Sequence, residues 1–165
     1  MRAALAERAR RAAAALRAPG PASELEVVLR RVTHADCAAI PAEDLAAAVR
    51  WAKGSEEALA KSLKHIQENI TANPSDWRRI HGALALFEAL AAEGGALIGR
   101  SWFEVKLQAR LKDLQTFSYD ADPRVASLVQ RAAKSANSVA EKLSWEDDGV
   151  FADEAAWLQV ALARW

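Results

Sequence analysis

Apolar residues recur at three- and four-residue intervals along almost the whole of this 165-residue chain. That spacing places them on one face of an α-helix, and no stretch alternates apolar and polar residues for long enough to predict a strand. The pattern therefore predicts an all-α protein. Seven or eight helices of about ten to twenty residues with short connections indicate an antiparallel bundle or a helical solenoid.

Capping residues, glycines and prolines mark the predicted helix boundaries. Ser23 and Glu26, three residues apart, form a capping box that begins a helix ending near Thr33. The turn at 72–76 offers Ser75 or Asp76 as the cap of the helix that follows it. Asp122 and Pro123 supply an N-cap and a first-turn proline. The other helices are predicted over 42–51, 56–70, 77–93, 96–118, 124–143 and 153–165, and the inward positions of the fourth are Leu97, Val105, Leu107, Leu111 and Leu114.

The helix predicted over 77–93 begins with an unusual combination of residues, Trp77, Arg78 and Arg79. A tryptophan at a helix start between stacked helices usually packs in the core, so we expect Trp77 to be buried and Arg79 to face solvent or a phosphate. Gly82 is expected to let a neighbouring helix approach closely. His81 is expected to be a half-buried packing residue.

Composition limits the classes of function. A hydrophobic fraction of 52% in 165 residues is enough for one domain with a buried core. The formal net charge is zero, so anion binding must come from a local patch. The single cysteine, Cys37, excludes an internal disulfide and fits a reducing compartment. No run of eighteen apolar residues is present, so no membrane-spanning segment is predicted.

Motifs for catalysis, metal binding and nucleic-acid binding are not found. The three histidines and Cys37 do not have metal-ligand spacing, and no P-loop, dinucleotide fingerprint or nucleophile elbow occurs. The arginines gather at one end of the chain and no nucleic-acid reader motif is present. We therefore predict no enzyme activity, no metal, no cofactor and no nucleic-acid partner.

Residues 1–20 form a basic, amphipathic segment. On a helical wheel the apolar side carries Met1, Leu5 and Leu16, and the opposite side carries Arg8, Arg10, Arg11 and Arg17. Interfacial helices have this pattern, with the apolar face in the headgroup region and the arginines against anionic lipid. Two alternatives stay open, which are a solvated alanine-rich helix and a transit peptide ahead of an unrelated helical domain.

Four segments in order resemble the ENTH (epsin N-terminal homology) domain, of the superfamily that includes ANTH and VHS domains. They are SELEVVLRRVTHAD at 23–36, DWRRIHGALALFEALAAEGG at 76–95, LKDLQTFSYDAD at 111–122 and RVASLVQRAAKSANSVAEKL at 124–143. The resemblance implies a right-handed solenoid of about eight helices preceded by an amphipathic N-terminal helix. The implied parts are the N-terminal segment 1–20, a helical domain over 21–144, and an acidic loop and C-terminal helix packing on it over 145–165.

The function implied by this resemblance is that of a peripheral membrane adaptor. Such a module binds phosphoinositide headgroups in clathrin-linked vesicle trafficking and endocytosis. It is expected to be a cytoplasmic monomer, peripheral on the plasma membrane or on endosomal or Golgi membranes, with clathrin-coat or cargo proteins as candidate partners. The alternative is an ENTH- or VHS-like protein-interaction module with little or no lipid specificity, which recognises a partner through a groove between helices.

The resemblance also implies site residues. Arg30 stands at the position of a headgroup-binding arginine, and Arg79 at that of a basic histidine, while Lys64 or His65 stands in for a further arginine. Gly82 occupies a position where lipid-binding members carry lysine. Basic residues of the N-terminal segment complete the implied headgroup set, which is Arg8, Arg10, Arg11, Arg17, Arg30, Lys64 and Arg79, with Met1, Leu5 and Leu16 for membrane insertion. Without a ligand, Arg30 and Arg79 are expected in surface ion pairs, for instance with Glu26 or Asp76.

Overall fold

The computed structural model describes residues 23–34, 39–94 and 107–142. Within these ranges every regular element is helical, which confirms the all-α prediction. The elements are α2 (Glu24–Thr33), α3 (Ala42–Gly54), α4 (Glu56–Ile70), the 3-10 helix η1 (Pro74–Asp76), α5 (Trp77–Gly94), α7 (Gln108–Leu114) and α8 (Pro123–Lys142). The segments 1–20 and 145–165 lie outside the described residues, so the eight-helix solenoid and the amphipathic N-terminal helix stay predictions.

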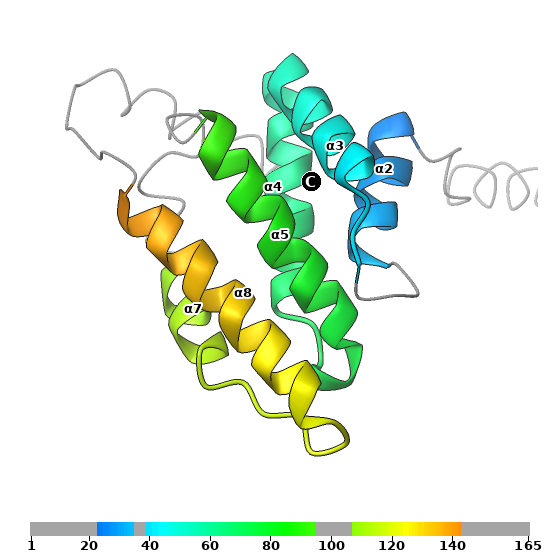
Figure 1. The fold of residues 1–165 in the computed structure, drawn as a ribbon. Coiled ribbons are helices and arrows are strands. Elements are labelled where there is room, and N and C mark those ends of the chain that lie inside the picture. Colours follow the sequence, from blue (N-terminus) through cyan, green and yellow to red (C-terminus); the bar gives the residue numbers. More distant parts are fainter. Residues whose placement is uncertain (1–22, 35–38, 95–106, 143–165) are drawn as a thin grey trace, which may run out of the picture.

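Helix α5 lies at the centre of the described part. It contacts α2, α3 and α4 on one side and α8 on the other, and α7 packs against α8 (Figure 1). Its apolar side chains are not confined to one stripe, because Ile80, Leu84, Leu86 and Phe87 are all fully buried. A helix that is apolar on most of its surface is stable only when other helices surround it. The central position of α5 follows from this composition.

The predicted capping box at the start of α2 is confirmed. Ser23 Oγ accepts the backbone N–H of Glu26, and Glu26 Oε2 accepts the backbone N–H of Ser23, both at 3.3 Å. These bonds satisfy two N–H groups that have no partner inside the helix. They hold the first turn of α2, which also carries Glu26, one residue of the site described below.

Replacing Ser23 with alanine is expected to lower the free energy of unfolding by about 1 kcal/mol, since an N-cap hydroxyl is lost. Denaturant titration of both chains measures the difference. Ser127→Ala is the matched control, because Ser127 is an exposed residue within α8 and no cap. Equal losses in the two variants contradict a capping role for Ser23.

The connection between α4 and α5 differs from the prediction. Neither Ser75 nor Asp76 is seen as the cap; Asn73 Oδ1 instead accepts the backbone N–H of Ser75 at 3.2 Å and caps η1, which continues directly into α5. Pro74, the first residue of η1, favours this earlier start because its fixed φ suits the first helical turn. The carboxylate of Asp76 is then free to approach Arg79, at 3.9 Å.

The prediction of a helix over 96–118 is wrong in its described part, where α7 begins at Gln108 and ends at Leu114, but several other boundaries agree with the predictions or extend them. Helix α3 continues past Trp51 to Gly54, after which Ser55 Oγ accepts the backbone N–H of Ala58 at 3.1 Å and caps α4. Pro123 is the first residue of α8 as predicted, and Asp122 Oδ1 accepts the N–H of Arg124 at 2.9 Å. Of the predicted inward positions, three are described and all three are buried: Leu107, Leu111 and Leu114.

Trp77 and Gly82 take the structural roles expected for them. Trp77 is buried, with 8% of its surface exposed, and the Arg78 guanidinium lies 4.7 Å from the centre of its ring. A Cβ added to Gly82 would overlap the Val32 carbonyl oxygen and lie 2.7 Å from Thr33 Cα. Glycine at this position therefore lets the end of α2 pack against α5. The lysine that the ENTH resemblance expects here has no room for its side chain.

Candidate anion-binding site

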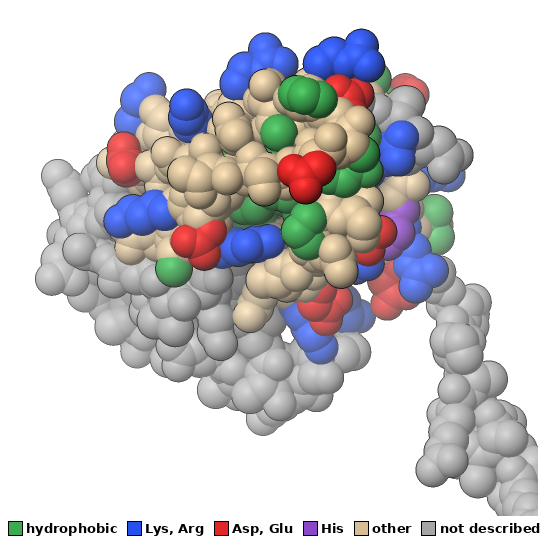
Figure 2. Space-filling model, turned by 90° about the horizontal axis from the view of Figure 1, so that it is seen from below, with side chains coloured by type: hydrophobic (Ala, Val, Ile, Leu, Met, Phe, Trp, Pro, Cys, Tyr) green, Lys and Arg blue, Asp and Glu red, His purple; other side chains and the backbone are tan. Residues whose placement is uncertain are grey.

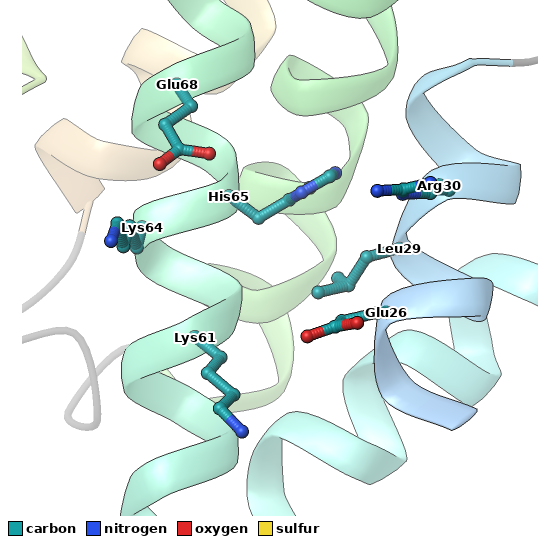
Figure 3. A pocket seen from close by; sticks show the side chains of 7 residues that line it. All are labelled: Glu26, Leu29, Arg30, Lys61, Lys64, His65 and Glu68. Atoms are coloured by element: carbon teal, nitrogen blue, oxygen red, sulfur yellow. The ribbon is translucent and has the colours of Figure 1, made fainter. Parts of the chain in front are cut away.

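A hollow of about 220 Å³ lies between α2 and α4. In Figure 3 Lys61 and His65 of α4 and Glu26 and Leu29 of α2 extend toward the facing helix, whereas Lys64 and Glu68 lie at the edge of α4 away from α2. The helices contribute residues at three-, four- and seven-residue spacing, which places each set on one helix face. The lining residues are Glu26, Leu29 and Arg30 from α2 and Lys61, Lys64, His65 and Glu68 from α4.

A buried threonine joins the two helices behind the hollow. Thr33 is fully buried, and its hydroxyl donates to the Leu29 carbonyl oxygen at 3.0 Å. The same oxygen lies 2.8 Å from His34 Nδ1 and 2.9 Å from His65 Nε2. A hydroxyl has only one proton to donate, so with that proton on the carbonyl both imidazoles must donate to Thr33. This arrangement fixes the distance between α2 and α4 at the hollow.

His65 is uncharged at neutral pH. Burial lowers its pKa to about 4, with further lowering from His34 and from the positive charges of Arg79 and Arg30. Partial burial and the same two arginines also lower the pKa of His34. The effect of both arginines on both histidines places the four side chains in one electropositive neighbourhood.

Arg30 and Lys64 are the unpaired cations of the hollow. Within the described part of the chain, neither has a side-chain hydrogen bond or an ion pair. Lys61 is different, because its Nζ lies 2.9 Å from Glu57 Oε1. A cation without an internal partner can bind an external anion without first breaking an ion pair.

Arg79 does not line the hollow. Its Nε donates to Asn69 Oδ1 at 2.8 Å, and its guanidinium lies 3.9 Å from Asp76, which is one of the ion pairs expected from the sequence. Asn69 is itself buried, and its amide donates to the His65 carbonyl at 2.7 Å. Arg79 of α5 is therefore held against α4 by its hydrogen bond to Asn69.

The structure thus brings together some of the predicted site residues and not others. Arg30 and Lys64 line one hollow, as does His65, whereas Arg79 lies beside it. The remaining candidates lie outside the described residues: Arg8, Arg10, Arg11, Arg17, Met1, Leu5 and Leu16. Sequence reasoning missed Lys61 and Glu68, although their three- and four-residue distances from Lys64 on a predicted helix are a signal that could have identified them.

Three further features of the described residues bear on function: metal-ligand clusters, membrane-spanning helices and the distribution of surface charge. Among them, no group of three or more histidine, cysteine or acidic side chains is arranged to hold a metal ion. None of the described helices is long and apolar enough to cross a membrane. On the face shown in Figure 2, basic and acidic side chains are interspersed rather than gathered into a field of one sign. On this face, the described residues therefore form no field of one sign that would attract an anion.

Comparisons with protein-family models, with curated proteins and with solved structures found no match to this chain. The residues of the α2–α4 hollow therefore carry the functional inference.

Proposed function

We propose that this chain is a peripheral membrane adaptor module that binds phosphoinositide headgroups at the α2–α4 hollow. The observation that carries the proposal is that Arg30 of α2 and Lys64 of α4 line one hollow and that neither has an ion-pair partner among the described residues. The ordered resemblance of four segments to the ENTH domain supports the same function.

The two cations have complementary capacities for a phosphate group. The planar guanidinium of Arg30 can donate two parallel hydrogen bonds to phosphate oxygens, and the ammonium of Lys64 acts as a compact point charge. His65 lies between them in the hollow as a neutral side chain, held by Thr33. A bound phosphate would favour the protonated form of His65, because it places negative charge near a buried imidazole.

The wider role follows the resemblance and belongs to this proposal. Residues 1–20 would fold on the membrane, with Leu5 and Leu16 in the headgroup region and the arginines against anionic lipid. The protein would act as a cytoplasmic monomer in clathrin-linked trafficking, on the plasma membrane or on endosomal or Golgi membranes. Clathrin-coat or cargo proteins are the proposed protein partners.

Liposome co-sedimentation tests the proposal. Vesicles of phosphatidylcholine with and without phosphatidylinositol phosphates are compared for the intact chain, for a chain lacking residues 1–18, and for Arg30→Gln/Lys64→Gln. The intact chain is expected to sediment selectively with the phosphoinositide vesicles. Loss of two charge-assisted contacts is expected to weaken binding at least about tenfold in the double variant. Deletion of 1–18 is expected to weaken it as well.

A matched charge control separates the site from general electrostatic attraction. Arg50→Gln/Lys134→Gln removes the same charge from exposed residues of α3 and α8, away from the hollow. This variant is expected to bind like the intact chain, and thermal unfolding checks that every variant is folded. Equal binding by the intact chain to vesicles with and without phosphoinositide contradicts the proposed function.

An apolar groove between α3 and α5 favours a second candidate function. Leu45, Val49 and Ala89 line it together with Arg50, and its volume is about 360 Å³. Grooves of this kind between helices can accept a short peptide segment. The alternative is therefore a protein-interaction module without lipid specificity, and indifference of the intact chain to the phosphoinositide in the experiment above would favour it.

A further inference from the structure

The charge that lines the α2–α4 hollow is small. Three cationic side chains and two carboxylates line it: Arg30, Lys61, Lys64, Glu26 and Glu68. This leaves one net positive charge, and His65 adds none at neutral pH because burial lowers its pKa. The hollow is therefore much less basic than its number of lysines and arginines suggests.

Existing contacts reduce the charge available to a ligand further. Lys61 lies 2.9 Å from Glu57, which offsets its charge, whereas Glu26 keeps its negative charge while it accepts the Ser23 N–H at 3.3 Å. Arg30 and Lys64 are then the cations that a ligand can engage. Glu68 opposes them, since its carboxylate has no side-chain hydrogen bond or ion pair within the described residues.

We infer that this hollow takes a ligand with a single phosphate monoester, of the phosphatidylinositol monophosphate class, in preference to a bisphosphate. The inference rests on the proposed function. One phosphate monoester carries a charge of about −1.5 to −2 at neutral pH, which the unpaired Arg30 and Lys64 offset more nearly than they could offset the charge of a bisphosphate.

Among the described residues that line the hollow, no further unpaired cation is available to a second phosphate. Arg79 is held by Asn69 and Asp76 outside the hollow, and Gly82 packs against the backbone of α2. The volume of about 220 Å³ is also below the roughly 300–1,000 Å³ of sites for drug-sized ligands. The hollow therefore fits one phosphate and the edge of the ring that bears it.

Glu68 is the residue that sets this preference. In Figure 3 its carboxylate lies on the same helix as Lys64, one turn further along α4. A second phosphate bound beyond Lys64 would enter the field of this carboxylate, and like charges at close range repel. Because Glu68 is exposed, its replacement by glutamine removes the charge without disturbing the core.

The test measures dissociation constants of the intact chain for two kinds of vesicle. One contains phosphatidylinositol monophosphate and the other phosphatidylinositol bisphosphate, with phosphatidylserine added to match total charge. The intact chain is expected to bind the monophosphate vesicles more tightly. Glu68→Gln is expected to improve binding to the bisphosphate about fivefold, and binding to the monophosphate less, as expected for a unit charge near a solvated surface.

A charge control and a competition experiment show whether the lipid preference comes from Glu68 and from the single phosphate. Asp120→Asn removes one exposed acidic charge from the loop between α7 and α8, and its lipid preference is expected to be unchanged. Soluble inositol monophosphate is expected to displace the chain from the vesicles. Binding of that soluble compound as tight as binding of the vesicle supports the same single-phosphate site and identifies the free inositol phosphate as its ligand.

The outcomes separate this inference from the proposed function. Tighter binding to the bisphosphate at matched charge overturns the single-phosphate preference and leaves phosphoinositide binding in place. An unchanged preference in Glu68→Gln overturns the role of Glu68. Absence of binding to both kinds of vesicle overturns the proposed function together with the inference.

Discussion

Replacing Gly82 with valine is expected to lower the free energy of unfolding by about 3 kcal/mol, at the upper end of the usual cost of overpacking. The new side chain would collide with backbone atoms of Val32 and Thr33, because a Cβ alone already overlaps the Val32 carbonyl oxygen. Backbone atoms cannot move aside as the end of a flexible side chain can. The end of α2 must therefore shift away from α5.

The same shift is expected to weaken anion binding. Arg30 lies in the last turn of α2, while Lys64 stays on α4. Thr33, whose backbone faces Gly82, also provides the hydroxyl that holds His65. Displacement of α2 thus separates the two cations of the hollow even in molecules that remain folded.

Denaturant titration and vesicle sedimentation measure the two effects. Gly82→Ala is expected to lower the free energy of unfolding less than Gly82→Val. Alanine adds only a Cβ, and it favours helix formation by about 1 kcal/mol over glycine, which offsets part of the loss. Gly54→Ala is the matched control, because a Cβ at that helical glycine meets nothing within 4 Å. A gain in stability for both alanine variants contradicts the close approach of α2 to Gly82.

Acidification from pH 7 to pH 5 is expected to destabilise the protein by about 1–2 kcal/mol through His65. Its folded pKa is lowered to about 4, first by burial and then by the nearby His34. In the unfolded chain a histidine titrates near its ordinary value of about 6.5. Between these values the unfolded state binds more protons, so stability is present above the unfolded pKa and falls as the pH is lowered toward the folded one.

His65→Gln tests the origin of this pH dependence. Glutamine can still donate a hydrogen bond to Thr33 but does not titrate, so the loss between pH 7 and pH 5 is expected to shrink. Burial lowers the pKa of His81 in the same direction, and His81→Gln gives the comparison at a second half-buried histidine. A pH profile that His65→Gln leaves unchanged contradicts the assignment.

Local signals made much of the secondary structure predictable. The capping box of Ser23 and Glu26 and the Asp122-Pro123 pair act over a few residues, and helices begin where they were expected. The sequence does not single out Asn73 as the cap, because Ser75 and Asp76 are residue types that cap helices equally well. The 3-10 helix that begins at Pro74 makes Asn73 the capping residue. Burial of Trp77 and close packing at Gly82 were also predicted, because few other roles suit those residues in a core helix.

The site was less predictable from the sequence. The family resemblance identifies Arg30 and Lys64 as candidates, but no local feature of the sequence shows that they line the same hollow. Arg79 was grouped with them, yet Asn69, ten residues earlier in the chain, holds it elsewhere. Glu68 is an ordinary exposed acid in the sequence, and its opposition to Lys64 depends on which face of α4 the packing leaves open.

The all-α fold, several helix boundaries and a buried central helix follow from the amino-acid sequence alone, because hydrophobic spacing and capping act between residues close in the chain. Which charged side chains meet depends instead on the packing of helices far apart in the chain. Thr33 and His65 are 32 residues apart, and their contact exists because α2 and α4 both pack on α5. The hollow with its unpaired Arg30 and Lys64 is a consequence of that packing, since such long-range contacts depend on the whole core and leave no periodic signal in the chain.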